Sequence, residues 1–409
     1  MEKIVVQQPM MTPIILLLVL SFVVSILTQF SADDEDGILQ TPQITIKYGY
    51  RTEVHKVETY DGFVVEMHRL TASPSTGQFD SGKPPVFIMH GLLGSSADWI
   101  LIGSQNALPY LLSDRGYDVW LGNARGNRYS REHTYLTIDM KEYWDFSWHE
   151  IGLYDVPAMI NHVLQSRRVE QLHYIGHSQG TTAFFVMMSL MPEFNKKIIK
   201  LHALAPAAYL YHLNNPAIRF LTTHLHTAMN VVNILGINQV MPSVPIFNHM
   251  ASLFCPNNRQ TCVKTMFLLS AGEYQDLDPK IIPVIVGHIP AGASIKQFVH
   301  YGQIVRSGRF RQFDYGSENN TQMYQSPEPP EYNLTYVRAP VAIYYGTQDQ
   351  LTHPMDVGRL ARELPNLVLL RQLTFNHLDF LLAADVKDVL YRDILTSIEE
   401  DSLSLNATV

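Results

Sequence analysis

One serine of the sequence stands in a setting that favours reactivity. Ser178 lies inside GHSQG, between Gly176 and Gly180, after the apolar run LHYI and before a stretch typical of a helix. The two glycines suit a sharp strand-to-helix turn, in which larger side chains at the flanking positions would clash. Such a turn exposes the hydroxyl above a sheet edge, where it can attack an acyl carbon. The pattern predicts a nucleophile; a glycine-rich turn with an incidental serine is the alternative.

A serine hydroxyl is a weak nucleophile, so this prediction requires partners later in the chain. The serine needs a histidine as base and a carboxylate that orients the histidine. Asp349 follows the apolar run PVAIYYG, and His377 follows the next such run, LVLLRQL. We expect two successive strand ends to bring both residues to one sheet edge. Two other acids, Asp356 and Asp379, are less favoured as the carboxylate because they fall in helical stretches. Two other histidines, His177 and His353, are less favoured as the base because packing or solvent contact explains them.

Attack by a serine on an acyl carbon creates a negative oxygen, which two backbone N–H groups usually stabilise. The residue after the nucleophile, Gln179, supplies one of these groups in the expected turn. A loop after an earlier strand should supply the other. The stretch FIMHGLLGSS has this form and offers the N–H of Leu92, just after His90 and Gly91. Without Ser178, these residues would indicate only a glycine turn.

The elements that must position these residues alternate between short apolar runs and helical stretches. The runs PVFIMHG, YDVWLGN, LHYIGHS and KLHALAPA predict parallel strands buried on both faces of a sheet. A hairpin turning at Asp61-Gly62 should precede them. The alternation stops from about Tyr209 to Pro330 and resumes at PVAIYYGTQD. We therefore expect a subdomain inserted between two strands.

The apolar block IILLLVLSFVVSIL, residues 14–27, follows Lys3 and precedes an acidic stretch. It predicts a signal peptide within residues 1–32, with an uncleaved anchor as the alternative. Export makes a disulfide between Cys255 and Cys262 plausible, although two free thiols remain the alternative. The same route fits the three N-glycosylation sequons, which begin at Asn319, Asn333 and Asn406.

The composition limits the classes of function. The chain has 409 residues, 46% of them hydrophobic and 17% charged, which suits a large core with an added subdomain. The net charge is −8 and no run of five basic residues occurs, so nucleic acid is a poor candidate partner.

These stretches together resemble the acid lipase family of the α/β-hydrolases, the gastric and lysosomal lipases with their insect relatives. The likeness runs through HGLLGSSADW, LGNARGNRYSREH, YWDFSWHEIGLYDVPAMI, LHYIGHSQGTT, HIPAGASIKQFVHYGQIVRSGRFRQFDYG and FNHLDFLLAADV. The resemblance implies an α/β fold with a mostly parallel central sheet flanked by helices. It also implies a Ser178, Asp349 and His377 triad, an oxyanion hole at Leu92 and Gln179, and a cap disulfide at the cysteine pair.

The expected order along the chain is a signal peptide at 1–32, core at 33–208, a mostly helical cap with a lid at 209–334, and core again at 335–409. The resemblance implies an exported lipase, secreted or lysosomal, that cleaves triacylglycerols or sterol esters at a lipid–water interface. No metal, organic cofactor or stable protein partner is implied. The sequence departs from the family's GYP at Gly49–Arg51 and carries Gln350-Leu351 after the acid, so substrate preference is open.

Two other functions compete with this one. A binding or storage protein could keep the scaffold without the chemistry, but the intact Ser178, Asp349 and His377 set speaks against it. Hydrolysis of epoxides is disfavoured by a serine at the turn, and hydrolysis of peptides is disfavoured by the resemblance.

Overall fold

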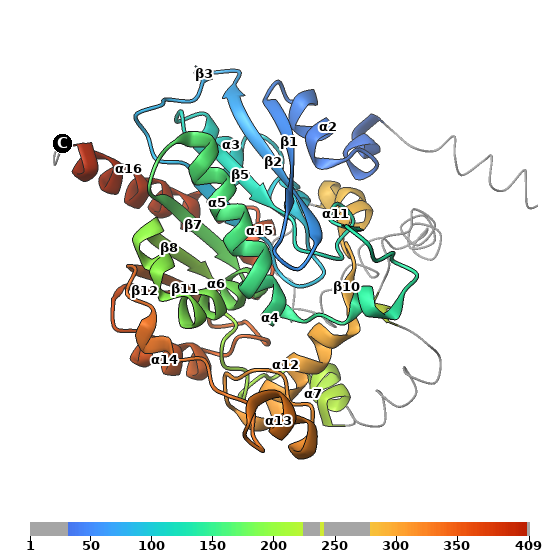
Figure 1. Ribbon diagram of the computed structural model, residues 1–409. Coiled ribbons are helices and arrows are strands. Elements are labelled where there is room, and N and C mark those ends of the chain that lie inside the picture. Colours follow the sequence, from blue (N-terminus) through green and yellow to red (C-terminus); the bar gives the residue numbers. More distant parts are fainter. Residues whose placement is uncertain (1–31, 224–237, 241–278, 407–409) are drawn as a thin grey trace, which may run out of the picture.

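The computed structural model describes residues 32–223, 238–240 and 279–406. A central sheet has helices against both of its faces, and α12 and α13 lie at one end of it (Figure 1). The expected signal peptide, apart from its last residue, lies outside the described residues, as do Cys255 and Cys262.

Within the described residues, ten strands form the main sheet, in the order β1-β2-β5-β4-β7-β8-β11-β12, with β3 and β6 also paired to β2. The first three of this order pair antiparallel, and every neighbouring pair from β5 to β12 is parallel. The strands are β1 (Arg51–Glu58), β2 (Phe63–Ser73), β3 (Gly77–Gln78), β4 (Val86–Met89), β5 (Val119–Gly122), β6 (Glu132–His133), β7 (Leu172–His177), β8 (Ile198–Leu204), β11 (Val341–Gly346) and β12 (Leu367–Leu373). The predicted strands and the hairpin at Asp61-Gly62 are therefore confirmed.

Helices cover the sheet, and others lie in the described parts of the insertion between strands. They are α2 (Thr41–Lys47), α3 (Leu108–Ser113), α4 (Trp148–Glu150), α5 (Val156–Arg167), α6 (Gln179–Leu190), α7 (Pro216–Thr223), α11 (Ile282–His288), α12 (Ile295–Ser307), α13 (Ser317–Tyr324), α14 (Pro354–Glu363), α15 (Asp379–Leu382) and α16 (Arg392–Asn406). Within the described ranges, no helix is both long and apolar enough to cross a lipid bilayer.

The central strands are mostly apolar because each has two faces to bury, although β7 and β8 also carry buried histidines. Along β7, Tyr174 joins the core beneath α5 and α6, whereas Ile175 joins the core beneath α3 and α16. Phe87 and Ile88 of β4 divide in the same way. Successive side chains of a strand point to opposite faces, so both positions must be hydrophobic when both faces are covered. This explains the continuous apolar runs of the sequence.

The insertion interrupts the sheet without separating its strands. β8 ends at Leu204 and β11 begins at Val341, yet the two strands are paired in parallel. The chain between them includes α7, α11, α12 and α13, together with the two-stranded sheet of β9 (Gln239–Val240) and β10 (Ala293–Ser294). The bounds 209–334 expected for a cap remain a prediction.

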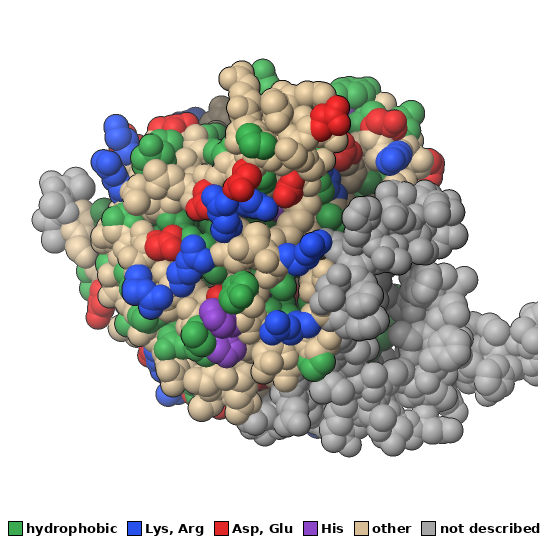
Figure 2. Space-filling view, turned by 90° about the horizontal axis from the view of Figure 1, so that it is seen from below, with side chains coloured by type: hydrophobic (Ala, Val, Ile, Leu, Met, Phe, Trp, Pro, Cys, Tyr) green, Lys and Arg blue, Asp and Glu red, His purple; other side chains and the backbone are tan. Residues whose placement is uncertain are grey.

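The outer surface mixes charges of both signs. On the face seen from below, blue and red side chains are interspersed over the coloured residues, and hydrophobic side chains form small separate groups (Figure 2). Arg359 and Glu363 of α14 form one exposed pair, 3.0 Å apart. Because an exposed pair of this kind contributes at most about 1 kcal/mol, the buried core carries most of the stability.

Two buried histidines lie side by side on the core strands. His173 of β7 and His202 of β8 are fully buried, and among the described residues neither ring nitrogen of His173 has a hydrogen-bond partner. Burial, together with the nearby Lys200 ammonium, lowers the pKa of His173 to about 3. The folded protein therefore resists protonation of a ring that the unfolded chain protonates near pH 6.5.

This depressed pKa predicts a loss of stability in acid. The stabilising contribution is present above the ordinary histidine pKa and is lost as the pH falls toward the folded-state value. For His173 alone, the loss reaches about 2 kcal/mol at pH 5. We expect His173→Leu to show a smaller drop in unfolding free energy between pH 7 and pH 5 than the wild type, measured by urea unfolding. The pH 7 value isolates the packing cost of the substitution, and parallel pH profiles for both proteins would contradict the prediction.

Candidate active site

Ser178 occupies the turn between β7 and α6 in a strained backbone conformation. Its φ is 50° and its ψ is −115°, a region that residues other than glycine rarely adopt. The turn is held in place because the Ser178 N–H donates to the Leu204 carbonyl at 2.9 Å and the Thr181 N–H donates to the Ser178 carbonyl at 2.9 Å. The hydroxyl of this half-buried residue therefore stands at the carboxyl edge of the sheet.

The two flanking glycines are required by close backbone packing. A Cβ atom on Gly180 would lie 2.5 Å from the carbonyl oxygen of Met89, on the neighbouring strand β4. A Cβ atom on Gly176 would lie 3.0 Å from the carbonyl carbon of Gly180. The expected crowding at both positions is confirmed, and the atoms that an added Cβ would meet belong to the main chain, which cannot move aside easily.

The structure brings the three expected side chains together. His377 Nε2 lies 2.8 Å from the hydroxyl oxygen of Ser178, and His377 Nδ1 lies 2.8 Å from Oδ2 of Asp349. Asp349 follows β11 and His377 follows β12, whose carboxyl ends lie at the same edge as that of β7. A histidine held between a hydroxyl and a carboxylate can take a proton from the hydroxyl while the carboxylate stabilises the resulting charge.

Asp349 is buried, and its loop satisfies both carboxylate oxygens. Oδ1 accepts from the N–H groups of Leu351 and Thr352, each at 2.8 Å, and Oδ2 accepts from the Thr352 hydroxyl at 2.5 Å. Burial by itself raises the pKa of Asp349, but the His377 ring and these bonds outweigh burial and hold the pKa below its ordinary value. The carboxylate is therefore ionised at neutral pH. Thr352 was missed from the sequence, although a threonine three residues after an aspartate is a recognisable local turn pattern.

The loop that carries His377 is fixed from two sides. A Cβ atom on Gly346 would lie 2.0 Å from the Phe375 carbonyl oxygen, so the two loops touch main chain to main chain. The His377 carbonyl oxygen lies 2.9 Å from Nε2 of His177, the residue just before Ser178. Because a carbonyl only accepts, Nε2 of His177 carries the proton. His177 has a buried packing role, as expected, and it also secures the His377 loop.

The competing acids are engaged elsewhere. Asp356 accepts from the backbone N–H of His212 at 2.7 Å, and its other oxygen lies 2.8 Å from His212 Nδ1. Asp379 accepts from the N–H of Asn376 at 2.7 Å at the start of α15. His353 caps α14, with its side chain accepting from the Met355 N–H at 3.2 Å. Each of these residues therefore has a structural partner of its own, away from the Ser178 hydroxyl.

The two expected N–H donors lie at the turn around Ser178. Gln179 is the first residue of α6, and within the described residues neither its N–H nor that of Leu92 donates to a backbone carbonyl. Gly91, which precedes Leu92, is so close to the serine that a Cβ atom on it would lie 3.2 Å from Ser178 Cβ. The loop that carries Leu92 therefore packs against the turn that carries Ser178 and Gln179.

The insertion reaches this site through hydrogen bonds that the sequence did not predict. Gln179 donates from Nε2 to Oε1 of Gln297, a buried residue of α12, at 2.7 Å. The carbonyl oxygen of Leu93 accepts from the N–H of Ala291 at 2.7 Å. The start of α6 and the loop after β4 are thus each held by a residue of the insertion more than a hundred positions away in the chain.

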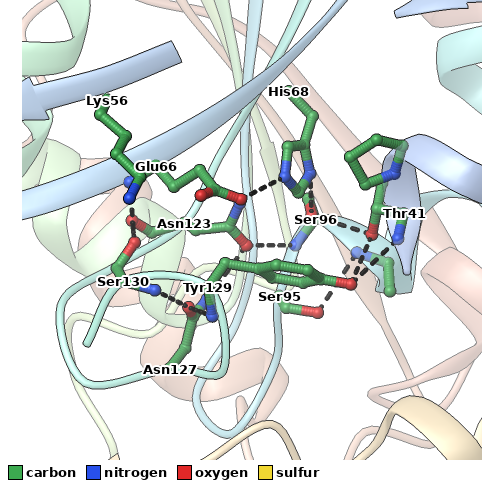
Figure 3. Close-up of polar contacts among 12 residues, drawn as sticks. Thr41, Lys56, Glu66, His68, Ser95, Ser96, Asn123, Asn127, Tyr129 and Ser130 are labelled. Carbon is green, nitrogen blue, oxygen red and sulfur yellow. Dashed lines mark hydrogen bonds and ion pairs between the residues drawn. The ribbon is translucent and has the colours of Figure 1, made fainter. Parts of the chain in front are cut away.

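A second set of serine, histidine and carboxylate side chains holds the loop after β4, but its serine is buried. His68 lies between Ser96 Oγ and Glu66 Oε1, at 2.8 Å from each (Figure 3). Ser96 and His68 are completely buried, and Ser96 also donates to the Thr41 hydroxyl at 3.1 Å. A buried and fully bonded hydroxyl cannot meet an ester, so this set braces the loop that follows Leu92.

Other expected features are placed as follows. Asn319 and Asn333 are exposed, and Asn406 is the last residue of α16. In the part of the chain that the structure describes, no cluster of three or more histidine, cysteine, aspartate or glutamate side chains could hold a metal ion.

Known proteins that resemble this chain have the fold that the sheet order and the strand–turn–helix around Ser178 indicate. A family model described as a partial alpha/beta-hydrolase lipase region matches residues 41–103. A second, described as the alpha/beta hydrolase fold, matches residues 84–234. A solved monoglyceride lipase from Saccharomyces cerevisiae is similar with a TM-score of 0.51 and 13% identity, over 85% of this chain and 96% of that chain, which shows the fold alone. The protein is an α/β-hydrolase.

Curated relatives narrow this class. Lipase 1 of Drosophila melanogaster is 43% identical, over 88% of this chain and 80% of its own length. Lipase 3 of the same species is 40% identical, over 86% and 90%. Human gastric triacylglycerol lipase is 36% identical, over 88% and 90%. The chain belongs to the acid lipase family and is a carboxylic ester hydrolase, so the resemblance found in the sequence is confirmed.

The close approach at Gly180 predicts opposite effects for two similar substitutions. Gly180→Ala should lower the free energy of unfolding by about 1–3 kcal/mol, because the added methyl overlaps the Met89 carbonyl. Gly358→Ala, also within a helix, should raise it by up to about 1 kcal/mol, because the nearest atom is the end of the Arg362 side chain at 3.6 Å. Chemical unfolding of both variants measures the contrast. Equal effects would show that packing at Gly180 is not tight.

Proposed function

We propose that the protein is a serine lipase that cleaves carboxylic esters of triacylglycerols or sterol esters through an acyl-enzyme intermediate. The observation that carries the proposal is the continuous chain from Ser178 Oγ to His377 Nε2 and from His377 Nδ1 to Asp349, with 2.8 Å at both contacts. Ser178, His377 and Asp349 act as nucleophile, general base and orienting carboxylate. Leu92 and Gln179 act as the oxyanion donors.

The first half of the reaction transfers the acyl group to the enzyme. Ser178 Oγ attacks the ester carbonyl carbon while its proton passes to His377 Nε2. The carbonyl oxygen becomes negative and is stabilised by the N–H groups of Leu92 and Gln179. When the tetrahedral intermediate collapses, the ester C–O bond breaks and the alcohol leaves with the proton from His377.

The second half releases the fatty acid. Water attacks the acyl-enzyme carbon as His377 takes one of its protons, and the same oxyanion donors stabilise the second tetrahedral intermediate. When this intermediate collapses, the bond between the acyl carbon and Ser178 Oγ breaks, the fatty acid leaves, and His377 returns the proton to Oγ. The ionised Asp349, satisfied by Leu351 and Thr352, keeps Nδ1 of the ring protonated throughout and so presents Nε2 to the serine.

The substrate class and the cap are supported by the relatives and by contacts around the site. Gastric triacylglycerol lipases are among the relatives, which supports a long-chain neutral lipid as the substrate. Residues 209–334 act as a cap in this proposal, and the bonds from Gln297 to Gln179 and from Ala291 to Leu93 support it. The working location is a lipid–water interface outside the cell or in the lysosome, as the apolar block at residues 14–27 favours.

Removal of the nucleophile provides the main test. We expect Ser178→Ala to hydrolyse emulsified trioleoylglycerol and cholesteryl oleate at least about 1,000-fold more slowly than the wild type, because no acyl-enzyme can form. The matched control is Ser96→Ala, which removes the buried serine of the second set and leaves Ser178 in place. Rates of fatty acid release from both emulsions, measured from pH 4 to 8, also rank the two substrate classes.

Covalent labelling separates an enzyme from a binding protein. An alkyl phosphonate should label Ser178 of the folded wild type and should not label Ser178→Ala, which mass spectrometry of the labelled peptide detects. If the folded wild type takes up no label and both emulsions stay intact, the protein would be a lipid-binding scaffold instead.

Export predicts glycans at the exposed sequons. In the secretory pathway, Asn319 and Asn333 should each carry one N-linked glycan, because both side chains are exposed. Asn319→Gln and Asn333→Gln should each remove one step of the mobility shift that peptide N-glycosidase produces on a gel. Asn366→Gln, outside any sequon, serves as the control. The prediction would be contradicted if wild-type protein recovered from the medium showed no change in gel mobility after treatment with peptide N-glycosidase.

A further inference from the structure

The peptide group between Gly91 and Leu92 is held by a histidine whose role the reaction scheme leaves open. The Gly91 carbonyl oxygen lies 2.7 Å from Nδ1 of His90, and it also accepts from the Gly94 N–H at 3.1 Å. In a trans peptide, the C=O and N–H of one peptide unit point in opposite directions. Two bonds that fix the Gly91 carbonyl therefore also fix the direction of the Leu92 N–H, the oxyanion donor of the proposed function.

The hydrogen bonds around His90 define where its proton lies. Nε2 of His90 accepts from the backbone N–H of Ala124 at 3.0 Å, and a backbone N–H can only donate. The Asn127 side chain also faces Nε2, with Nδ2 at 3.2 Å. A neutral imidazole has one donor nitrogen and one acceptor nitrogen, so the proton of His90 is on Nδ1. His90 therefore donates to the Gly91 carbonyl.

The orientation of Asn127 is also fixed. Its Oδ1 accepts from the N–H groups of Tyr129 and Ser130, at 2.9 and 3.2 Å, so Nδ2 must face His90 and Asn123. In Figure 3, Asn123 lies beside Ser96, and Asn127 lies lower in the view. Asn123 Oδ1 accepts from the Ser96 N–H at 2.9 Å. Both ends of the segment 91–96 are thus tied to the loop after β5.

Burial reinforces this arrangement. His90 is 3% exposed, and burial lowers its pKa to about 4, although its bond to the Gly91 carbonyl acts in the opposite direction. The ring is therefore neutral across the neutral and mildly acidic range, where Nε2 stays available as an acceptor for Ala124.

We propose that His90 is a positioning residue for ester hydrolysis: by donating from Nδ1 to the Gly91 carbonyl, it aims the Leu92 N–H at the oxyanion. This inference rests on the proposed function and extends it to a residue that does not touch the substrate. The sequence around His90 and Gly91 alone indicates only a glycine turn. The proposal gives His90 the further role of setting the direction of the Leu92 N–H. The bond should matter most in the transition state, because the oxyanion develops there.

The experiment compares variants that keep or remove the δ donor. His90→Asn places an amide N–H near the position of Nδ1, whereas His90→Leu has none. Rates are measured with soluble p-nitrophenyl butyrate, which separates kcat from KM without an interface. His173→Leu serves as a control for the loss of a buried histidine on β7, away from this loop. Amide hydrogen exchange of the segment 91–95 in each protein reports the order of the loop independently of activity.

We expect His90→Leu to lower kcat by about 10- to 100-fold with little change in KM, in line with the weakening of one oxyanion donor. His90→Asn should recover most of this loss, and exchange in the segment 91–95 should be faster in His90→Leu than in the wild type. If His90→Leu does not fold, His90→Gln replaces it, since its N–H lies one bond too far out.

Three results would overturn the proposal. The first is a folded His90→Leu protein with kcat within about twofold of the wild type, well short of the loss expected for a donor. The second is an asparagine variant as slow as the leucine variant. The third is unchanged exchange in the segment 91–95. If the wild type hydrolyses neither this ester nor the two emulsions, the proposed function fails, and hydrogen exchange alone then decides whether His90 orders the loop.

Discussion

Parallel pairing of β7, β8, β11 and β12 is the constraint on which the site depends. Parallel strands end at one edge, so residues that follow β7, β11 and β12 meet there, although Ser178 lies about 170 to 200 positions before Asp349 and His377 in the chain. The pairing of β8 with β11 holds this edge together despite the long insertion between the two strands. If the pairing of β8 with β11, or of β11 with β12, slipped by a residue, Asp349 or His377 would leave hydrogen-bonding range of its partner in the site.

The sequence was sufficient for features that depend on local pattern. Apolar runs could be recognised as strands, and Asp349 and His377 could be selected because each follows such a run. The run before His377 forms β12, most of whose residues are exposed at the edge of the sheet. The glycines around Ser178 were also expected, because a tight turn excludes side chains on general steric grounds. The atoms involved, such as the Met89 carbonyl facing Gly180, belong to another strand and could not be named.

Features that depend on packing between distant segments could not be predicted. Nothing near Gln297 marks it as the partner of Gln179, because the contact exists only after α12 has docked on α6. The same holds for His177 and His90, whose tautomers are set by a carbonyl and by an N–H from other loops. With 17 histidines in the chain, residue type alone carried little information, and only the three-dimensional partners distinguish these roles.

The bond between Gln179 and Gln297 belongs to a longer ordered series. Ser294 donates to the Phe146 carbonyl at 2.5 Å, so it must accept from Gln297 Nε2, which leaves Oε1 of Gln297 for Gln179. The hydrogen bonds between core and insertion therefore all have a fixed donor and acceptor. No single residue of the series can exchange these roles unless its neighbours do so too. A chimaera that receives its insertion from a relative would keep this junction only if the donated segment offers an acceptor at the place of Gln297 and a serine, or another donor–acceptor, behind it.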